Sequence, residues 1–305
     1  MLQDRLVYLN GDFVEWDRAT VHIMSHSLAR GSAIFEVISL HKTEGAPVVF
    51  RLDEHIHRLF RSAQLLSMEL PLSKEATHEA VLATVKRNRL EQGMIKVVCY
   101  YHEVAFDISP PKTPLRMCIV ALDPAQDLSG IGLFSVKSWS ACISPWKKLH
   151  PEMVPIEAKV AANYLNGMMA RLDAKRRGFD MGILLDAEGF VAEGSVESVF
   201  WLSGGVLTSP ALGTILQGIT RKSVLEAAKR IGLKTAEERR PPGDLIKADE
   251  IFISCSPEKI LPIHKIEDRA LKEVPGPITA KLQALFEKIC SGSDPRFTEW
   301  LFPVK

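Results

Sequence analysis

The pattern of apolar and polar positions in the first part of the chain predicts a sheet with helices packed beside it. Apolar runs at Val7–Leu9 and Phe13–Val14 flank Asn10-Gly11, a dipeptide that favours a two-residue hairpin turn because both positions tolerate positive φ. Further strands are expected at residues 33–40, 47–50, 95–101 and 115–122, and helices with the helical apolar period at 52–67 and 74–89. This order favours an α+β layer with the helices on one side of the sheet.

The second part of the chain is richer in predicted strands. We expect strands at residues 133–138, 181–185, 199–201 and 251–254, and helices at 161–177, 220–231 and 278–289. Gly178 and Gly232 follow two of these helices as C-terminal caps, and Gly204-Gly205 predicts a hairpin turn. The excess of strands favours a barrel-like or sandwich architecture, while residues after about 264 show only packing positions and a tail.

A break in the apolar pattern divides the chain. Asp123–Gly130 carries Pro, Ser and Gly and offers little to bury. We therefore expect a small α/β domain over residues 1–123, a linker over 124–132 and a larger domain over 133–305. The length of 305 residues fits two domains of about 100–200 residues each.

Composition narrows this picture mainly by exclusion. Apolar residues make up 46% of the chain and charged residues 25%, which is typical of soluble globular proteins. A net charge of +1 gives no reason to expect a nucleic-acid or membrane-surface partner. The start carries charges within its first five residues and lacks a long apolar core, so we expect no signal peptide. Five widely spaced cysteines without a C-x-x-C pair favour buried thiols and a cytoplasmic protein.

A lysine among small apolar residues is the first candidate for chemistry. Lys159 lies in Pro155–Leu165, where partial desolvation would lower its pKa and make the amine a usable nucleophile. Taken alone, the segment is explained more simply by a lysine that extends into solvent from the start of a helix. Tyr164 either lies near the same site or only packs. His55 and His57 are two residues apart on a predicted helix and do not face each other, so we expect no metal site.

Other segments carry polar groups that suit an anion or a cation. In Gln217–Arg221, Thr220 lies where a loop meets a predicted helix, and backbone N–H groups at a helix start bind phosphate well. An ordinary threonine N-cap explains the same residue. Ser256 follows a predicted strand and adds a hydroxyl. Glu193 lies between two strands, and a carboxylate buried there needs a cationic partner.

Together these segments resemble the class IV (fold-type IV) aminotransferases, a family that includes branched-chain amino-acid aminotransferases, D-amino-acid aminotransferases and aminodeoxychorismate lyases. The similarity extends from Tyr8 to about Ile263. It rests on four motifs in order along the chain: Val21–Leu28, Ala158-Lys159 with Asn163–Leu165, Phe190–Phe200 and Leu216–Arg221. The resemblance implies a two-domain α+β fold, with a small α/β N-terminal domain and a larger strand-rich pseudo-barrel domain.

The resemblance also implies a cofactor, pyridoxal 5'-phosphate (PLP), and a role for each motif residue. Lys159 would carry PLP as a Schiff base and move the proton during catalysis, and Glu193 would keep the pyridine nitrogen protonated. Tyr164 would hydrogen-bond the phenolic oxygen. The remaining implied contacts are those of the ring face and the phosphate: Leu216, Arg58, Ile219, Thr220 and Ser256. Active sites of this family form at dimer interfaces, so we expect a homodimer.

The sequence departs from the branched-chain members at positions that bear on the substrate. Arg30 stands where those enzymes usually have Tyr, Lys96 stands where they commonly have Arg, and Pro257 lacks the N–H that they offer to the substrate carboxylate. We therefore expect Arg30 or Lys96 to bind the α-carboxylate and Phe35 to contact the substrate. An arginine can bind a carboxylate through two parallel hydrogen bonds.

The leading hypothesis is a transaminase that moves an amino group between an amino acid, with a branched-chain or related apolar side chain, and a 2-oxo acid. Val37-Ile38 after Phe35-Glu36 resembles the D-amino-acid branch instead, so the handedness of the substrate stays open. A PLP lyase would use the same cofactor residues without an amino acceptor. A non-catalytic PLP-binding protein is less consistent with the chain because Lys159 and Glu193 are both present.

Overall fold

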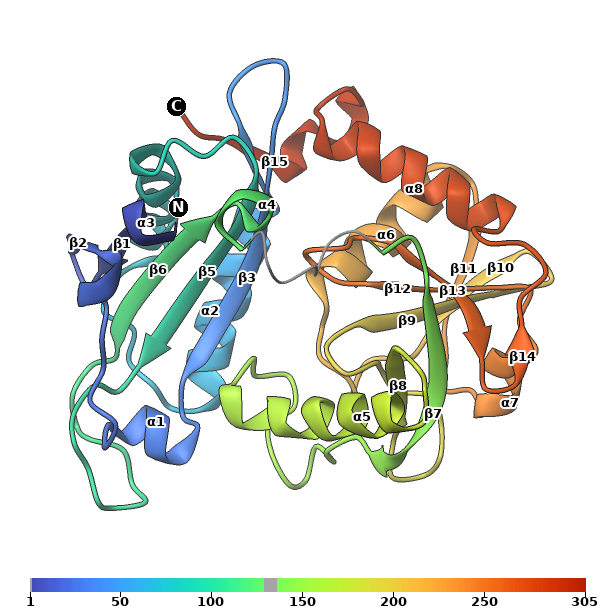
Figure 1. The fold of residues 1–305 in the computed structure, drawn as a ribbon, viewed down its shortest axis with the longest axis horizontal. Helices are drawn as coiled ribbons and strands as arrows, with labels where there is room; N and C mark the ends of the chain where they lie inside the picture. The colour runs from blue at the N-terminus through green and yellow to red at the C-terminus, as the bar shows by residue number, and fades with distance from the viewer. Residues whose placement is uncertain (1, 129–135) are drawn as a thin grey trace. The chain divides into compact units, whose positions relative to one another are not determined.

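The computed structural model describes residues 2–128 and 136–305, which form two compact units (Figure 1). Unit 1 combines the described residues of Met1–Phe134 with Ala158–Ala162 and Lys288–Lys305, and unit 2 combines those of Ser135–Glu157 with Asn163–Glu287. The chain therefore returns twice to unit 1 after the expected boundary, because each returning segment adds backbone pairing to the first sheet.

Unit 1 is built on a seven-stranded sheet with the order β15-β4-β3-β5-β6-β1-β2, in which neighbours are antiparallel. Its strands are β1 Leu6–Leu9, β2 Asp12–Glu15, β3 Ile34–His41, β4 Val48–Phe50, β5 Gly93–Tyr100, β6 Arg116–Leu122 and β15 Leu301–Pro303. Asn10 and Gly11 have φ of 53° and 114°, which confirms the predicted hairpin. The C-terminal strand β15 was not predicted, although it closes the edge of the sheet beside β4.

The helices of unit 1 follow the predicted pattern. They are α1 His26–Arg30, α2 Leu52–Leu65 and α3 Lys74–Arg87, and the last two confirm the predicted helices. Figure 1 shows α2 and α3 behind the strands, on one face of the sheet. Their apolar residues share one buried cluster with those of β3, β5 and β6, which confirms the α+β layer.

The sheet of unit 1 therefore has one covered face and one open face. Ile34 and Ile38 of β3 are buried against the helices, and Phe35 alternates with them and is only half-buried. In β5, Lys96 is exposed and lies between the buried residues Ile95 and Val97. Because successive side chains of a strand point to opposite sides, Phe35 and Lys96 share the open face.

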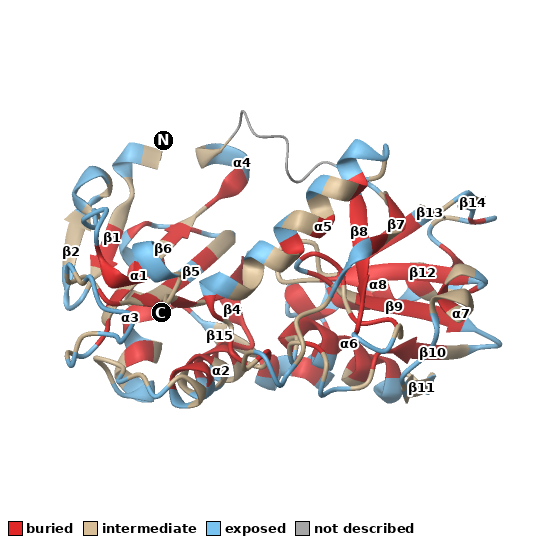
Figure 2. Ribbon diagram, turned by 90° about the horizontal axis from the view of Figure 1, so that it is seen from below, coloured by how far each residue is buried: buried red, intermediate tan, exposed pale blue. Residues whose placement is uncertain are grey.

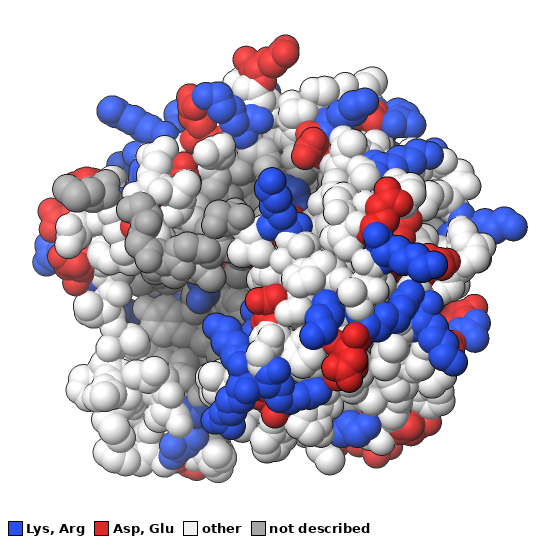
Figure 3. Space-filling model, turned by 45° about the vertical axis from the view of Figure 1, so that its right-hand side comes forward, with Lys and Arg blue, Asp and Glu red and all other residues white. Residues whose placement is uncertain are grey.

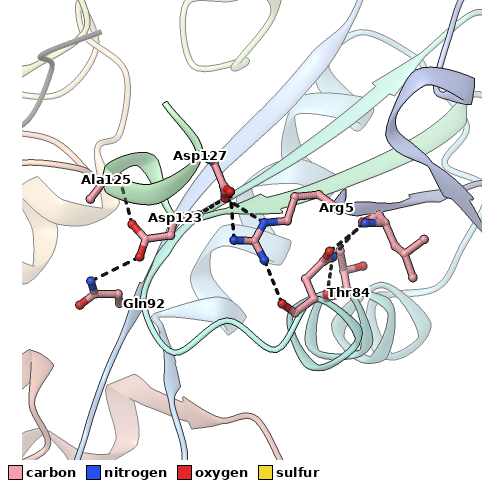
Figure 4. A network of polar contacts seen from close by, with 8 residues as sticks. Arg5, Thr84, Gln92, Asp123, Ala125 and Asp127 are labelled. Carbon is pink, nitrogen blue, oxygen red and sulfur yellow. Dashed lines mark hydrogen bonds and ion pairs between the residues drawn. The ribbon is translucent and has the colours of Figure 1, made fainter. Parts of the chain in front are cut away.

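The expected linker begins with ordered structure. Pro124–Asp127 forms the short helix α4, and Figure 4 shows how the Arg5 guanidinium donates hydrogen bonds of 2.8 and 3.0 Å to the Asp127 carboxylate. Asp123 caps this helix with its side chain. Residues 124–127 are therefore tied to unit 1, while residues 129–132 of the expected linker lie outside the described residues.

Unit 2 is built on an eight-stranded sheet with the order β11-β10-β9-β12-β13-β7-β8, and β14 pairs with β13. Its strands are β7 Trp139–Lys147, β8 Met181–Leu185, β9 Ser198–Ser203, β10 Val206–Ser209, β11 Lys234–Glu237, β12 Glu250–Ser254, β13 Leu261–Ile266 and β14 Arg269–Ala270. The pairs β10–β11, β13–β7 and β7–β8 are parallel, and the other pairs are antiparallel. The predicted wealth of strands in this half is confirmed.

The helices of unit 2 mostly confirm the predictions, and one predicted strand is wrong. The helices are α5 Tyr164–Arg176, α6 Ile219–Arg230, α7 Pro242–Ile246 and α8 Pro277–Cys290. Of the strand predicted at 133–138, residues 133–135 lie outside the described residues, and residues 136–138 form no strand. The strand β7 begins at Trp139 instead. β11 was missed because three of its four residues are polar and none is fully buried, so the strand lacks an apolar signal.

Both units bury residues along their strands, as Figure 2 shows. In unit 2, Phe200 of β9 and Phe252 of β12 stack with ring centroids 4.8 Å apart. None of the helices in the described part of the chain is both long and apolar enough to span a bilayer. Basic and acidic side chains are interspersed over the face in Figure 3, in line with a net charge of +1.

Candidate active site

Lys159 is fixed in unit 1 by its backbone. Its N–H donates to Ser62 Oγ at 3.0 Å, its carbonyl accepts from Phe35 N at 3.0 Å, and the next residue bridges Ile34. The lysine therefore lies in an extended segment between β3 and α2, and the interpretation as the start of a helix is wrong. Its side chain is half-buried, with Nζ 5.0 Å from the centroid of the Phe35 ring.

Behind β3, Arg58 belongs to a buried cluster of charges. Its Nε and Nη2 donate to the two carboxylate oxygens of Glu36, both at 2.7 Å, and His55 Nδ1 lies 2.7 Å from the same carboxylate. Burial alone would raise the pKa of Glu36, but Arg58 and His55 lower it from 4.5 to about 2. Burial lowers the pKa of His55, so the neutral ring donates its Nδ1–H to Glu36. The cluster fixes the guanidinium that sequence reasoning assigned to a phosphate.

The three residues predicted to contact the substrate are only partly brought together. The ring of Phe35 lies 5.0 Å from Lys159 Nζ and 5.4 Å from Lys96 Nζ, so one aromatic ring links the two amines. Arg30 is instead tied to a loop, because its guanidinium donates to the carbonyl of Phe106 at 3.2 Å. Of the two candidate carboxylate partners, Lys96 is therefore the one placed beside Lys159.

In unit 2, Glu193 has the cationic partner that its burial requires. Lys148 Nζ lies 2.5 Å from Oε1, and the N–H of Leu216 donates to Oε2 at 3.2 Å. The carboxylate is 12% exposed and the Lys148 side chain is 10% exposed. Sequence reasoning missed Lys148, because nothing in the pair Lys147-Lys148 shows which of the two side chains turns inward.

The start of α6 forms an open cradle for an anion. Gly218 is the N-cap and supplies no side chain to cap the helix, so the interpretation of Thr220 as an ordinary N-cap is wrong. Ile219 and Thr220 are buried in the first turn, where the backbone N–H groups point out of the helix. A Cβ at Gly218 would lie 2.7 Å from Ser198 Oγ, so glycine lets the loop lie close to β9 at this position.

An unpartnered hydroxyl lies beside this cradle. Ser254, the register partner of Ser198 across β9 and β12, is 2% exposed, and its Oγ is one of two buried side-chain atoms without a hydrogen-bond partner among the described residues. Buried polar groups in folded proteins are normally hydrogen-bonded, so an orphaned hydroxyl next to free helix amides fits an anionic ligand. Ser256 follows two residues later in the turn after β12 and is half-buried. These residues fit a phosphate group.

Two further residues of unit 2, Tyr164 and Glu197, belong to the sequence motifs. Tyr164 is the first residue of α5 and is half-buried. Glu197, which is 2% exposed, pairs with Arg171 of α5 and accepts a hydrogen bond from Val196 N at 3.0 Å, so it braces the loop that carries Glu193. Sequence reasoning noticed the acidic motif but not this internal ion pair. No group of three or more potential metal ligands occurs in the described part of the chain.

Comparison with known proteins places this geometry in a family. The family described as "Amino-transferase class IV" matches residues 33–266. The branched-chain-amino-acid aminotransferase of Salmonella typhimurium is 31% identical over 300 residues, covering 98% of this chain and 97% of the relative. A putative branched-chain-amino-acid aminotransferase of Methanocaldococcus jannaschii is 37% identical over 289 residues, covering 93% and 96%.

Solved structures agree with this assignment over the whole chain. The branched-chain aminotransferase of Thermoproteus uzoniensis with norvaline gives a TM-score of 0.92 at 33% identity, with 99% of each chain covered. A second branched-chain amino acid aminotransferase, complexed with N-(5'-phosphopyridoxyl)-L-glutamate, gives 0.93 at 31% identity, with 100% of each chain covered. With its phosphate cradle, its fixed lysine and this likeness in sequence and fold, the chain belongs to the class IV aminotransferases, the fold-type IV enzymes that use PLP.

Proposed function

We propose that this enzyme transfers the amino group of L-amino acids with branched-chain or related apolar side chains to a 2-oxo acid. The observation that carries the proposal is the open sheet face beside Lys159. There Phe35, Val98 and Val120 offer a half-buried apolar wall, and the ammonium of Lys96 lies among them. Such a face suits a substrate that has an apolar side chain and a carboxylate. Of the similar solved enzymes, one was captured with norvaline and another with an L-glutamate adduct, and the adduct favours the L-series over the D-series.

When bound, PLP would supply an electrophilic carbon and an electron-accepting ring, and the motif residues would each take one role around it. Lys159 would bind the cofactor through its amine and then move the proton at the substrate α-carbon. By resemblance to the family, Arg58, Ile219, Thr220 and Ser256 would hold the phosphate. Glu193 would face the pyridine nitrogen, Tyr164 the phenolic oxygen and Leu216 the ring. Lys96, with Arg30 as the second candidate, would bind the carboxylate.

We further propose that the enzyme works as a homodimer. In unit 1, Ile23, Phe106 and Ile108 are 72–79% exposed. The two segments that carry them are hydrogen-bonded to each other, because Ala105 N donates to the Met24 carbonyl at 3.4 Å and His26 Nε2 contacts the Ile108 carbonyl at 3.1 Å. Large exposed apolar patches mark interaction surfaces, and a second copy of the chain is the occupant that the family implies. Light scattering of wild type and of Phe106→Ser would test this, since the variant is expected to shift towards monomer.

A cytoplasmic location agrees with the thiols. All five cysteines are free, and burial raises the pKa of Cys118 and of Cys142 to about 11, so neither is a reactive thiolate at neutral pH. Free buried thiols are typical of a reducing compartment. Fractionation of cells that express the chain would test the location, and recovery outside the cytoplasm would contradict it.

The proposed reaction is tested by following the absorbance of the PLP-loaded enzyme as single amino acids are added. Conversion of the aldehyde form of the cofactor to the amine form by L-leucine, L-valine or L-isoleucine, reversed by a 2-oxo acid, is the expected result. Conversion by the D-enantiomers alone would assign the chain to the D-amino-acid branch. A cofactor band that no amino acid changes would favour the lyase or a non-catalytic binder instead.

A further inference from the structure

Lys148 makes the shortest polar contact to Glu193, although none of the four sequence motifs contains it. Its Nζ lies 2.5 Å from Oε1, on the opposite oxygen from the Leu216 N–H. Both carboxylate oxygens are therefore held by fixed donors of the protein itself. A carboxylate whose side chain is only 12% exposed needs a cationic partner, and Lys148 supplies it.

One strand fixes both members of this pair. Lys148 donates its backbone N–H to the carbonyl of Leu185 at 2.8 Å, at the end of β8. Glu193 accepts a hydrogen bond from Leu184 N, also at 2.8 Å, through its backbone carbonyl. The two side chains thus start from backbones attached to consecutive residues of the same strand. Their contact is set by the sheet and does not depend on a mobile loop.

The backbone on both sides of Lys148 is also fixed by hydrogen bonds. These bonds decide that Lys148, rather than Lys147, turns its side chain inward. Asn166 of α5 donates to the carbonyl of Lys147 at 2.8 Å and accepts from Leu149 N at 3.3 Å. This clamp from both sides fixes the orientation of the peptide between them. Lys148 points to Glu193, while the Lys147 side chain stays exposed.

We propose that Lys148 is a positioning residue that pairs with Glu193 and holds its carboxylate in the orientation in which it meets the ring nitrogen of PLP. The proposal rests on the assignment of Glu193 to that nitrogen under the proposed function. Lys148 acts through Glu193 and needs no contact with the cofactor. Its effect on cofactor binding should therefore vanish once Glu193 has lost its charge.

The test measures equilibrium binding of PLP to the apo protein, by fluorescence titration, for wild type and matched variants. Lys148→Met is expected to weaken binding by about tenfold or more, because it leaves the carboxylate buried without its cation. Lys148→Arg keeps the charge and should recover most of the affinity. Lys147→Met, one residue away on the exposed side, should bind within about twofold of wild type.

The decisive comparison is made in the Glu193→Gln background. There Lys148→Met should change the PLP affinity by less than about twofold, since no carboxylate remains to be held. The double variant also relieves the buried charge, so it tests the proposal even if Lys148→Met alone folds poorly. An equal loss in both backgrounds, or no loss in either, would overturn the role of Lys148. Failure of wild type to bind PLP would instead overturn the proposed function.

Discussion

The two units differ in how fully the protein itself satisfies the buried polar groups near their candidate site residues. In unit 1, Glu36 is 1% exposed and receives three donors, two from Arg58 and one from His55. In unit 2, the buried hydroxyl of Ser254 near the start of α6 has no hydrogen-bond partner among the described residues. The Glu36 cluster of unit 1 is therefore satisfied by its own side chains, whereas under the proposed function Ser254 of unit 2 gains its partner from a ligand. Substitutions in the first should cost folding free energy, and substitutions in the second should cost cofactor affinity.

A second pair of carboxylates shows that the surrounding charges and hydrogen-bond donors, rather than the depth of burial, decide the direction of the pKa shift. Glu36 and Glu197 are both almost completely buried, at 1% and 2% exposure. Arg58 and His55 together outweigh burial and lower the pKa of Glu36. Burial, together with the nearby carboxylate of Glu258, outweighs Arg171 and the Val196 N–H and raises the pKa of Glu197. Equal burial therefore gives opposite shifts, because desolvation is offset only where enough donors converge.

The largest expected effect is at Lys159. This residue belongs to unit 1, yet under the proposed function its amine reacts with the cofactor, so its loss should cost activity rather than stability. Lys159→Ala should reduce transamination by at least about 1,000-fold, since both the nucleophilic amine and the proton carrier are lost. Lys159→Arg should be equally inactive, because it restores the charge beside Phe35 but not a usable nucleophile. Steady-state rates and circular dichroism of both variants check this. Substantial activity in either one would refute the assignment of Lys159.

Removing the unit 1 anion tests whether that cluster is structural. Glu36→Gln leaves the Arg58 guanidinium without this buried counter-charge, so the free energy of unfolding should fall by about 3–5 kcal/mol. The control is Glu91→Gln, which breaks an ion pair with Lys42 whose side chains are 65% and 63% exposed, and should cost less than about 1 kcal/mol. Urea unfolding measures both. Equal losses would mean that burial does not distinguish the two pairs.

Lowering the pH should weaken the same cluster in two steps. His55 has a pKa below its usual 6.5, so below that pH the unfolded chain takes up a proton that the folded chain does not. The contribution of Glu36 is complete above pH 4.5 and is lost as the pH falls towards its folded pKa of about 2, a change of about 3 kcal/mol. Unfolding at a series of pH values measures the sum. The step below pH 4.5 should shrink in Glu36→Gln, and its persistence there would contradict the assignment.

The smallest effect is expected in unit 2 and should leave stability untouched. Ser254→Ala removes a buried hydroxyl that has no partner in the described protein, so the free energy of unfolding of the apo protein should stay the same or rise slightly. Its affinity for PLP should fall by about tenfold, the size of one hydrogen bond to a charged group. Ser203→Ala, at the exposed end of β9, is the control and should change neither quantity. An unchanged PLP affinity in Ser254→Ala would show that this hydroxyl does not serve the cradle.

Much of the fold could be predicted because its signals are local. The Asn10-Gly11 turn, the period of α2 and the apolar run of β8 each depend on a few neighbouring residues. Predictions failed where the local signal was weak or where long-range pairing decided the outcome. The polar strand β11 gains its place beside β10 by pairing, and β15 joins β4 from the far end of the chain.

The order of motifs along the chain was enough to indicate the family and the cofactor, because each motif is a short run of neighbouring residues. The packed fold, by contrast, determined which charged side chains come into contact. The pairing of Lys148 with Glu193, of Arg58 with Glu36 and of Lys96 with the Phe35 ring joins residues that lie far apart in the sequence. Burial and donor geometry, which set whether a carboxylate is held ionised, exist only after those segments have packed together.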